Sequence, residues 1–266
     1  MNDGPIAMFD SGFGGLTVAR AVMDLLPGEE LVYLGDTARY PYGPRPMDEV
    51  RRFALQIADE LVGEHKAKLL VVACNTAAAA ALDELADRYD IPVVGVIEPG
   101  VRSLCAATRN GRVGVIGTVG TIDSGAYQQS LVAAAPGVVS VALACPGFVE
   151  FVERGETDSE QVHVLASRLL APAIGAGIDA LLLGCTHYPY LARTIADVMG
   201  RDVVLVSSAD ETAFEVRHLL DSRGLARDTP PSPPTFLTTG DVAWFQDLGG
   251  RLLGPELAAA DQVLFD

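Results

Sequence analysis

The segment Leu69-Leu70-Val71-Val72-Ala73-Cys74-Asn75-Thr76-Ala77 gives the clearest indication of the fold. A short apolar run ends at a cysteine, a small polar residue follows, and a helical pattern begins, which is typical of a strand, a turn and a helix start. The same order returns about half a chain length later in Ala180-Leu181-Leu182-Leu183-Gly184-Cys185-Thr186-His187-Tyr188. The repetition predicts two similar halves that face each other across a cleft, each with one cysteine at the carboxyl end of a strand.

Short apolar runs alternate with longer helical patterns along most of the chain. The predicted strands are Ile6–Phe9, Leu31–Leu34, Leu69–Ala73, Val93–Ile97, Val113–Ile116, Val138–Ala142, Leu181–Leu183, Val203–Val206 and Thr235–Thr238. The predicted helices are Leu16–Leu26, Met47–Glu64, Thr76–Arg88, Ser124–Ala134, Glu160–Ile174, Leu191–Met199 and Glu211–Leu220. Continuous apolar strands that alternate with helices are typical of parallel sheets covered on both faces. The predicted fold class is therefore α/β, with two parallel-sheet domains.

The division into domains is drawn from the same pattern, because no Ser/Gly-rich linker marks it. We expect residues 1–97 together with 208–266 to form the domain that carries Cys74, and residues 98–207 to form the domain that carries Cys185. The proline-rich segment Pro230–Pro234 is short enough to be a rigid connector.

Composition excludes several classes of function. The 266 residues include 19 Lys and Arg against 35 Asp and Glu, a formal net charge of −16, so we expect no nucleic-acid partner. No apolar run is long enough for a membrane span, and the acidic start Met1–Gly4 has no basic region typical of an export signal. Four cysteines in a chain of this length fit a reducing cytoplasm better than a disulfide scaffold.

Lysine chemistry is also restricted. Lys66 and Lys68 are the two lysines of the chain, and both lie in a short polar connector, so we expect no Schiff-base cofactor. Glu29 and Glu30 are expected to be solvated, whereas Glu150 and Glu153 could place a carboxylate near a cleft.

The glycines of Phe9-Asp10-Ser11-Gly12-Phe13-Gly14-Gly15-Leu16-Thr17 match neither a dinucleotide-binding loop nor a Walker A loop, since Thr17 replaces the last glycine and no lysine follows. Two interpretations stay open. The loop is either a tight turn that permits close backbone packing, or a nest of N–H groups with Asp10 and Ser11 facing a small ligand.

The cysteines fall into two groups. Cys74 and Cys185 each precede a predicted helix start, where the partial positive charge favours a thiolate. Cys105, in a helical pattern, and Cys145, before Pro146 in a turn, are interpreted as structural.

We expect no metal site. Cys185 and His187 have no second ligand pair, and His65, His163 and His218 each stand alone in predicted helical stretches.

The residues after the two cysteines form a further pattern. Asn75-Thr76 and Thr186-His187 would make a polar cup suited to a carboxylate, although helix capping explains each turn by itself. The same residues leave two other functions open. A cysteine hydrolase could use Cys185 and His187, and a non-catalytic module could hold an amino acid in the cup.

With these motifs the chain resembles the glutamate racemases, cofactor-independent enzymes of the aspartate/glutamate racemase superfamily. The resemblance runs from about Ile6 to Gly249. The segments that carry it are Phe9–Thr17, Gly35–Gly43, Cys74–Ala77, Gly114–Thr118, Gly120–Ile122 and Leu183–Pro189. His187 resembles the glutamate branch, because aspartate racemases tend to carry Glu after the second Cys-Thr.

The resemblance implies a reaction and a set of roles. Cys74 and Cys185 would be the two acid/base residues, with Asp10 helping Cys74 and His187 helping Cys185. Glu153 matches a further family acid. The substrate contacts it implies are Asp10, Ser11, Tyr42, Gly43, Asn75, Thr76, Thr118, Thr121, Thr186 and His187.

The implied activity is interconversion of L- and D-glutamate without cofactor or metal, in the cytoplasm, by an enzyme that is often a homodimer. Its D-glutamate would feed peptidoglycan synthesis. Racemisation of a related amino acid such as aspartate stays as an alternative.

Overall fold

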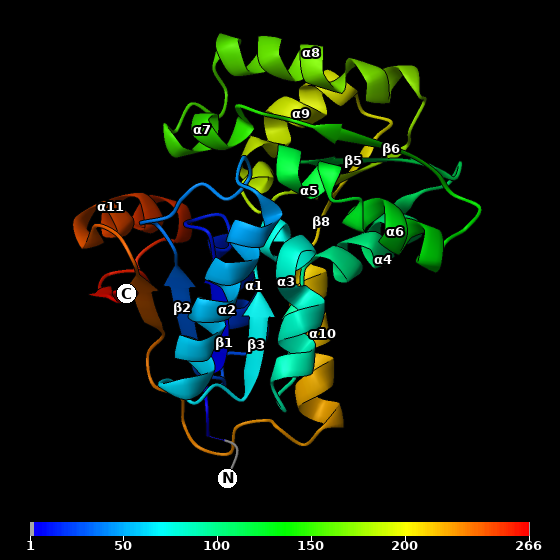
Figure 1. Cartoon of the computed structure of the whole chain (residues 1–266). Helices are drawn as coiled ribbons and strands as arrows, with labels where there is room; N and C mark the ends of the chain where they lie inside the picture. Colours follow the sequence, from blue (N-terminus) through cyan, green and yellow to red (C-terminus); the bar gives the residue numbers. More distant parts are fainter. Residues whose placement is uncertain (1–2, 266) are drawn as a thin grey trace.

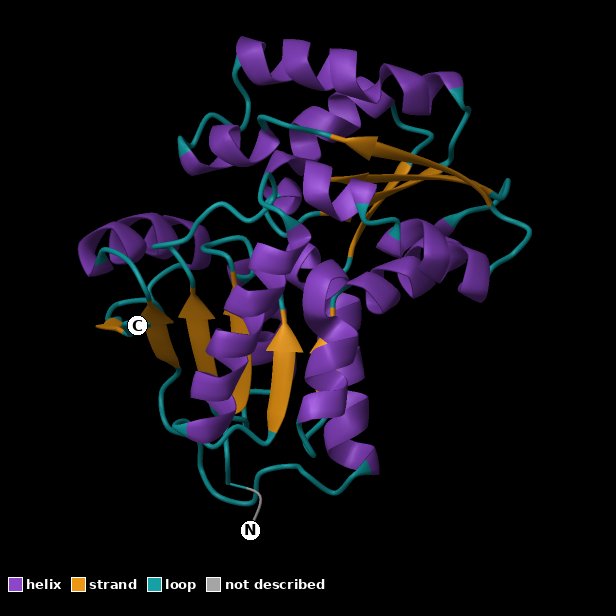
Figure 2. Ribbon diagram, in the orientation of Figure 1, coloured by secondary structure: helices purple, strands orange, loops and turns teal. Residues whose placement is uncertain are grey.

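The chain folds around two parallel sheets, as the computed structural model of residues 3–265 shows (Figures 1 and 2). Three residues lie outside the described part of the chain. They are Met1 and Asn2, in the segment that we expect to carry no export signal, and Asp266, at the end of the predicted domain range 208–266. Every strand pairing in the two sheets is parallel. The predicted α/β class with two parallel-sheet domains is confirmed.

The first sheet has six strands in the order β10-β9-β2-β1-β3-β4. Its strands are β1 (Ile6–Asp10), β2 (Leu31–Gly35), β3 (Leu69–Val72), β4 (Val93–Gly95), β9 (Thr235–Thr238) and β10 (Asp261–Gln262). The three strands β1, β2 and β3 are buried along their whole length, as their unbroken runs of apolar residues predicted. Their arrowheads point toward the part of the molecule that holds the second sheet (Figure 2).

The second sheet has four strands in the order β6-β5-β7-β8. Its strands are β5 (Arg112–Gly117), β6 (Val139–Ala144), β7 (Ala180–Gly184) and β8 (Val204–Ser207). The prediction that all strands are buried is wrong for β6 and β8, where Val139 is 58% and Val204 45% exposed. These two strands form the edges of the sheet, so each lacks a neighbour on one side.

Helices cover the sheets and fill the crossovers, as parallel strands require. They are α1 (Leu16–Leu25), α2 (Met47–Gly63), α3 (Asn75–Arg88), α4 (Ile97–Ala107), α5 (Val119–Asp123), α6 (Ala126–Ala134), α7 (Phe148–Glu153), α8 (Glu160–Gly175), the 3₁₀ turn η1 (Tyr188–Leu191), α9 (Ala192–Met199), α10 (Ala209–Ser222) and α11 (Val242–Leu253). The predictions contain no counterpart of α5, α7, α11 or β10, and α4 only as a helical pattern around Cys105. No helix among residues 3–265 is long and apolar enough to cross a membrane.

Some boundaries of the predicted elements are wrong. The predicted strand Val93–Ile97 stops at Gly95, and Ile97 already opens α4. The apolar run continues across the boundary, so periodicity could not separate strand from helix. The predicted helix Ser124–Ala134 starts only at Ala126, because Gly125 adopts a left-handed conformation with φ of 73° and separates α5 from α6.

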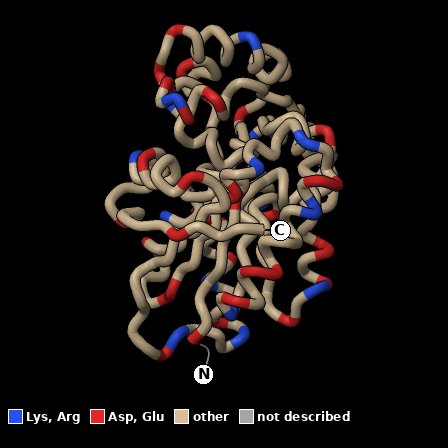
Figure 3. The backbone as a smooth tube through the Cα atoms, turned by 60° about the vertical axis from the view of Figure 1, so that its left-hand side comes forward, with Lys and Arg blue, Asp and Glu red and all other residues tan. Residues whose placement is uncertain are grey.

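Charged residues differ from expectation at two places. Lys68 and Glu29 form a buried ion pair, with Nζ and Oε2 2.6 Å apart and side chains 6% and 7% exposed. Glu30 pairs with Arg227 at 3.0 Å. The prediction that both glutamates are solvated is therefore wrong for Glu29, whose carboxylate is buried against Lys68, whereas the Glu30 side chain stays 21% exposed. His65 also lies beyond the end of α2 rather than inside a helix. Elsewhere basic positions are scattered among acidic ones (Figure 3).

Candidate active site

Cys74 and Cys185 line the same cavity, which has a volume of about 100 Å³. Cys74 follows β3 of the first sheet, and Cys185 follows β7 of the second. The carboxyl ends of strands are where open α/β sheets place ligand sites. The other predicted site residues that line the cavity are Asp10, Ser11, Tyr42, Gly43, Asn75, Thr76, Thr118, Thr186 and His187. Thr121 is fully buried behind this lining.

Cys74 is the N-cap residue of α3, as the sequence predicts. Burial, followed by the charge of Asp10, raises the pKa of its thiol to about 12. The backbone N–H groups of Ala77 and Ser11 act in the opposite direction, but they are outweighed. The expectation that the helix start favours a thiolate here is therefore wrong, because loss of hydration costs the anion more than the N–H groups return.

Cys185 lies in a turn rather than at the start of an α-helix. The 3₁₀ turn η1 begins at Tyr188, and α9 follows it at Ala192. The predicted helix start beside Cys185 is thus displaced by several residues. The Cys185 sulfur instead lies beside the imidazole of His187, with Sγ and Nδ1 3.8 Å apart.

The neighbours of His187 raise the pKa of its imidazole. Burial lowers its pKa, but the hydrogen bond with Cys185, the ion pair with Glu153 and the charges of Cys185 and Asp10 more than compensate, and the pKa is raised to about 10. Its Nε2 is 3.3 Å from Oε1 of Glu153, which projects from α7. Glu150, from the same helix, lines the cavity. Both glutamates lie near the cleft, as the sequence indicated.

Asp10 connects the glycine loop to the turn around Cys185. Its Oδ1 accepts the Gly12 N–H at 2.8 Å, and its Oδ2 accepts the Thr186 hydroxyl at 3.3 Å. Burial is the largest influence and raises its pKa, against the charge of His187 and the hydrogen bonds that lower it. Burial thus makes this carboxylate a better proton acceptor.

Close packing explains the glycine at position 14. A Cβ there would lie 2.4 Å from both Nδ1 of His187 and Oγ1 of Thr186. The loop after β1 can therefore approach the turn after β7 only because residue 14 has no side chain. Of the two interpretations of the loop, this packing supports the first. Asp10 and Ser11, which the second interpretation places beside a small ligand, line the cavity.

Three threonine hydroxyls join α3 to the start of α5. Oγ1 of Thr76 lies 3.1 Å from that of Thr118 and 3.0 Å from that of Thr121, and the latter two are 3.0 Å apart. Thr121 is absent from the cavity lining and holds the other two hydroxyls in place. Thr118 also caps α5 by accepting the Thr121 N–H at 3.3 Å.

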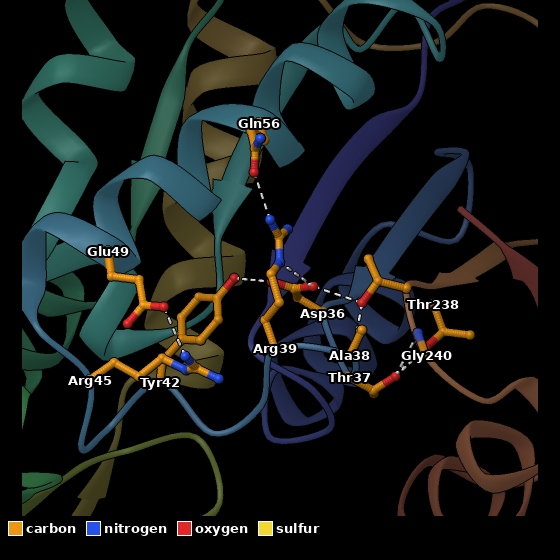
Figure 4. A network of polar contacts seen from close by, with 11 residues as sticks. Asp36, Thr37, Ala38, Arg39, Tyr42, Arg45, Glu49, Gln56, Thr238 and Gly240 are labelled. Carbon is orange, nitrogen blue, oxygen red and sulfur yellow. Dashed lines mark hydrogen bonds and ion pairs between the residues drawn. The ribbon is translucent and has the colours of Figure 1, made fainter. Parts of the chain in front are cut away.

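The loop that carries Tyr42 and Gly43 is held by Asp36, a residue to which the sequence analysis gave no role (Figure 4). The buried carboxylate accepts the Arg39 Nε–H at 2.7 and 3.0 Å, the Thr239 hydroxyl at 2.7 Å and the Tyr42 hydroxyl. The Gly43 carbonyl in turn accepts the Gly120 N–H of α5 at 2.9 Å. The signal in the sequence that could have identified Asp36 is an acidic residue just after the predicted strand Leu31–Leu34, within the motif Gly35–Gly43.

Several further residues that line the cavity were not predicted from the sequence. Tyr40, Cys145, Pro146 and Tyr188 line the cavity, although Cys145 was interpreted as structural. Cys145 follows the end of β6 as Cys74 follows the end of β3. The predicted strand stopped two residues short, at Ala142, and this hid the similarity. Burial and the charge of Cys185 raise the pKa of the Cys145 thiol to about 12.

All four cysteines are free thiols. Among residues 3–265, no group of three or more His, Cys, Asp or Glu side chains could hold a metal ion.

The chain is similar in sequence to known racemases. The Asp/Glu/Hydantoin racemase family model matches residues 16–215. A glutamate racemase of Parafrankia sp. (strain EAN1pec) is 56% identical, over 97% of this chain and 94% of its own length. The glutamate racemase of Corynebacterium glutamicum is 52% identical, over 98% of this chain and 96% of its own.

Solved structures of such enzymes have the same fold. A glutamate racemase isoform from Bacillus anthracis superposes with a TM-score of 0.93 at 40% identity, over 100% of this chain and 98% of that one. The glutamate racemase of Francisella tularensis in complex with D-glutamate gives a TM-score of 0.91 at 32% identity, with the same coverage. The chain therefore belongs to the Asp/Glu/Hydantoin racemase family and, within it, to the glutamate racemases.

Proposed function

We propose that this chain interconverts L- and D-glutamate by removing the α-proton from one face of the α-carbon and delivering another to the opposite face. One observation carries the proposal: thiols from two different sheets, Cys74 and Cys185, line one cavity. A single base cannot reach both faces of an α-carbon, whereas two opposed thiols can act as base and acid in turn.

The division of labour is part of the proposal. Cys74 removes the α-proton of D-glutamate, with Asp10 as the group that exchanges its proton. Cys185 removes that of L-glutamate, beside His187. With a pKa of about 10, His187 is protonated near neutral pH and places a positive charge beside the Cys185 sulfur. The protonated Cys74 thiol is ready to deliver its proton to a carbanion formed from L-glutamate.

The carbanion needs stabilisation as charge builds on the substrate carboxylate. Hydroxyl and amide groups of Ser11, Asn75, Thr76 and Thr186 line the cavity and can donate to carboxylate oxygens. A transition-state preference of about 1.4 kcal/mol is worth roughly tenfold in rate. These donors take the place of the electron sink that a cofactor supplies in other racemases.

The cellular setting follows from the same proposal. The D-glutamate supplies peptidoglycan synthesis in the cytoplasm, an environment that suits the free thiols. We also propose a homodimer, and a domain division into 1–97 with 208–266, and 98–207. Sheet membership supports this division, because β1–β4, β9 and β10 belong to the first sheet and β5–β8 to the second.

Circular dichroism of L-glutamate in the presence of the purified protein, without added cofactor, tests the function. The optical signal should decay to zero, since enantiomers are equal in free energy, and should do so after exhaustive dialysis against chelator. L-aspartate in the same assay tests the related substrate. An unchanged signal with either glutamate enantiomer and folded protein would favour a binding module, and a covalent acyl intermediate with Cys74 dispensable would favour a hydrolase.

A further inference from the structure

Asn75 carries an unpartnered donor beside the cavity. The residue follows Cys74 as the first residue of α3, lines the cavity and is 3% exposed. Its Nδ2 is buried without a hydrogen-bond partner. An unsatisfied buried amide donor costs about 1–3 kcal/mol, so this NH₂ group indicates a place where a ligand supplies the acceptor.

The other half of the same amide is held by Tyr127. The Tyr127 hydroxyl donates to Oδ1 of Asn75 at 2.5 Å, across 52 positions of sequence. Tyr127 belongs to α6, is fully buried, and has a pKa raised by burial above its usual range. The hydroxyl therefore keeps its proton and acts as a donor, which only the amide oxygen can accept.

Tyr127 also packs against the turn of the second cysteine. A Cβ added to Gly184, the residue before Cys185, would lie 2.9 Å from Cε2 and 3.2 Å from Cζ of the Tyr127 ring. The ring thus occupies the space beside Gly184 while its hydroxyl reaches Asn75. One side chain contacts the residue before one thiol and the residue after the other.

We propose that Tyr127 is a positioning residue of the site: its hydroxyl holds the Asn75 amide so that Nδ2 faces the cavity and donates to a carboxylate oxygen of the substrate. This inference rests on the proposed function. Without the hydroxyl the amide is free to turn over, and Oδ1 would then face the carboxylate as a second acceptor. Tyr127 acts through Asn75 and takes no part in the proton transfers.

A double-mutant cycle with Tyr127→Phe and Asn75→Ala tests the proposal in the full-length protein, with steady-state racemisation of both glutamate enantiomers as the readout. Tyr127→Phe removes one hydroxyl and keeps the ring beside Gly184. We expect KM to rise about two- to tenfold, the equivalent of one hydrogen bond, with kcat changed less. In the Asn75→Ala background the same substitution should have less than about a twofold effect.

Tyr89→Phe is the matched control. The Tyr89 hydroxyl donates to Asp59 at 2.6 Å beyond the other end of α3, on the surface. This variant should keep the wild-type KM and kcat. Asn75→Asp is a second probe that leaves Tyr127 intact. Its carboxylate still accepts the Tyr127 hydroxyl but turns an oxygen toward the substrate, so KM should rise about tenfold or more.

Each outcome of these experiments supports or overturns the positioning role of Tyr127. An unchanged KM in folded Tyr127→Phe, an undiminished effect in the Asn75→Ala background, or an unchanged KM in Asn75→Asp would overturn the positioning role. A loss of thermal stability in Tyr127→Phe with KM unchanged would show a structural residue only. Failure of the proposed function is seen separately, because the wild-type protein would then not racemise glutamate in the same assay.

Discussion

Oδ2 of Asp10 accepts a hydrogen bond from Oγ1 of Thr186 at 3.3 Å, although 176 positions separate the two residues. Asp10 ends β1 of the first sheet, and Thr186 follows Cys185 at the end of β7 of the second. The charge of Asp10 also acts on Cys74. One carboxylate therefore links the surroundings of the two thiols, so a change at Asp10 should be felt on both sides of the cavity.

Replacing either thiol should separate the two half-reactions. Cys74→Ser and Cys185→Ser should each lower racemisation by about 10³-fold or more, because a hydroxyl is a far weaker acid. Elimination from a glutamate analogue with a β-chloro leaving group needs only the proton-removing base. Cys74→Ser should therefore eliminate from the L-analogue and Cys185→Ser from the D-analogue, as chloride release would show. Loss of elimination with both enantiomers in both variants would refute independent bases.

Asp10→Asn should change reactivity and activity in opposite directions. The Asp10 charge is, after burial, the second cause of the raised Cys74 pKa, so its removal should lower that pKa while burial keeps it above the usual value. The pH midpoint for alkylation of Cys74 by iodoacetamide, followed by mass spectrometry, should shift down. Racemisation should fall, because a proton acceptor is lost. Cys105 in the same sample is the internal control, and an unshifted Cys74 midpoint would contradict the assignment.

His187 should make stability depend on pH. Its pKa in the folded protein is about 10, above the ordinary value of 6.5, so the folded state holds the proton more tightly than the unfolded state. Its contribution is full below about pH 6.5 and is lost as pH rises through about 10, by at most about 1.4 kcal/mol per pH unit. In urea unfolding from pH 6.5 to 9, the stability difference between wild type and His187→Gln should shrink. Parallel pH profiles would argue against the raised pKa.

Asp36→Asn should loosen the loop that carries Tyr42 and Gly43. The substitution removes the charge that pairs with Arg39, whose side chain is 18% exposed, and it weakens the hydrogen bonds around a fully buried carboxylate. We expect a loss of about 2–3 kcal/mol in the free energy of unfolding, together with a higher KM for glutamate. Glu49→Gln, which removes the half-exposed pair with Arg45, should cost less than about 0.5 kcal/mol. Equal costs for the two variants would show that Asp36 has no special role.

Local sequence pattern determined most of the secondary structure. The apolar runs of β1, β2 and β3 were recognisable because all their residues are buried, which leaves a continuous signal. The pattern did not predict element boundaries at places where the spacing of apolar residues does not change between neighbouring elements. At Ile97 an apolar run crosses from strand to helix, and at Gly125 a left-handed glycine breaks a continuous helical pattern.

For the site, the two cysteine turns and the resemblance to the racemases were visible in the sequence alone. Each of the motifs that carry them is a short run of consecutive residues. Tertiary structure decided the rest. That Cys74 and Cys185 share a cavity depends on two sheets meeting at their strand ends. The Cys74 thiol remains protonated because burial and a carboxylate from β1 outweigh the start of its own helix. Hydration and charge at a buried atom are set by neighbours distant in the chain, and no local pattern records them.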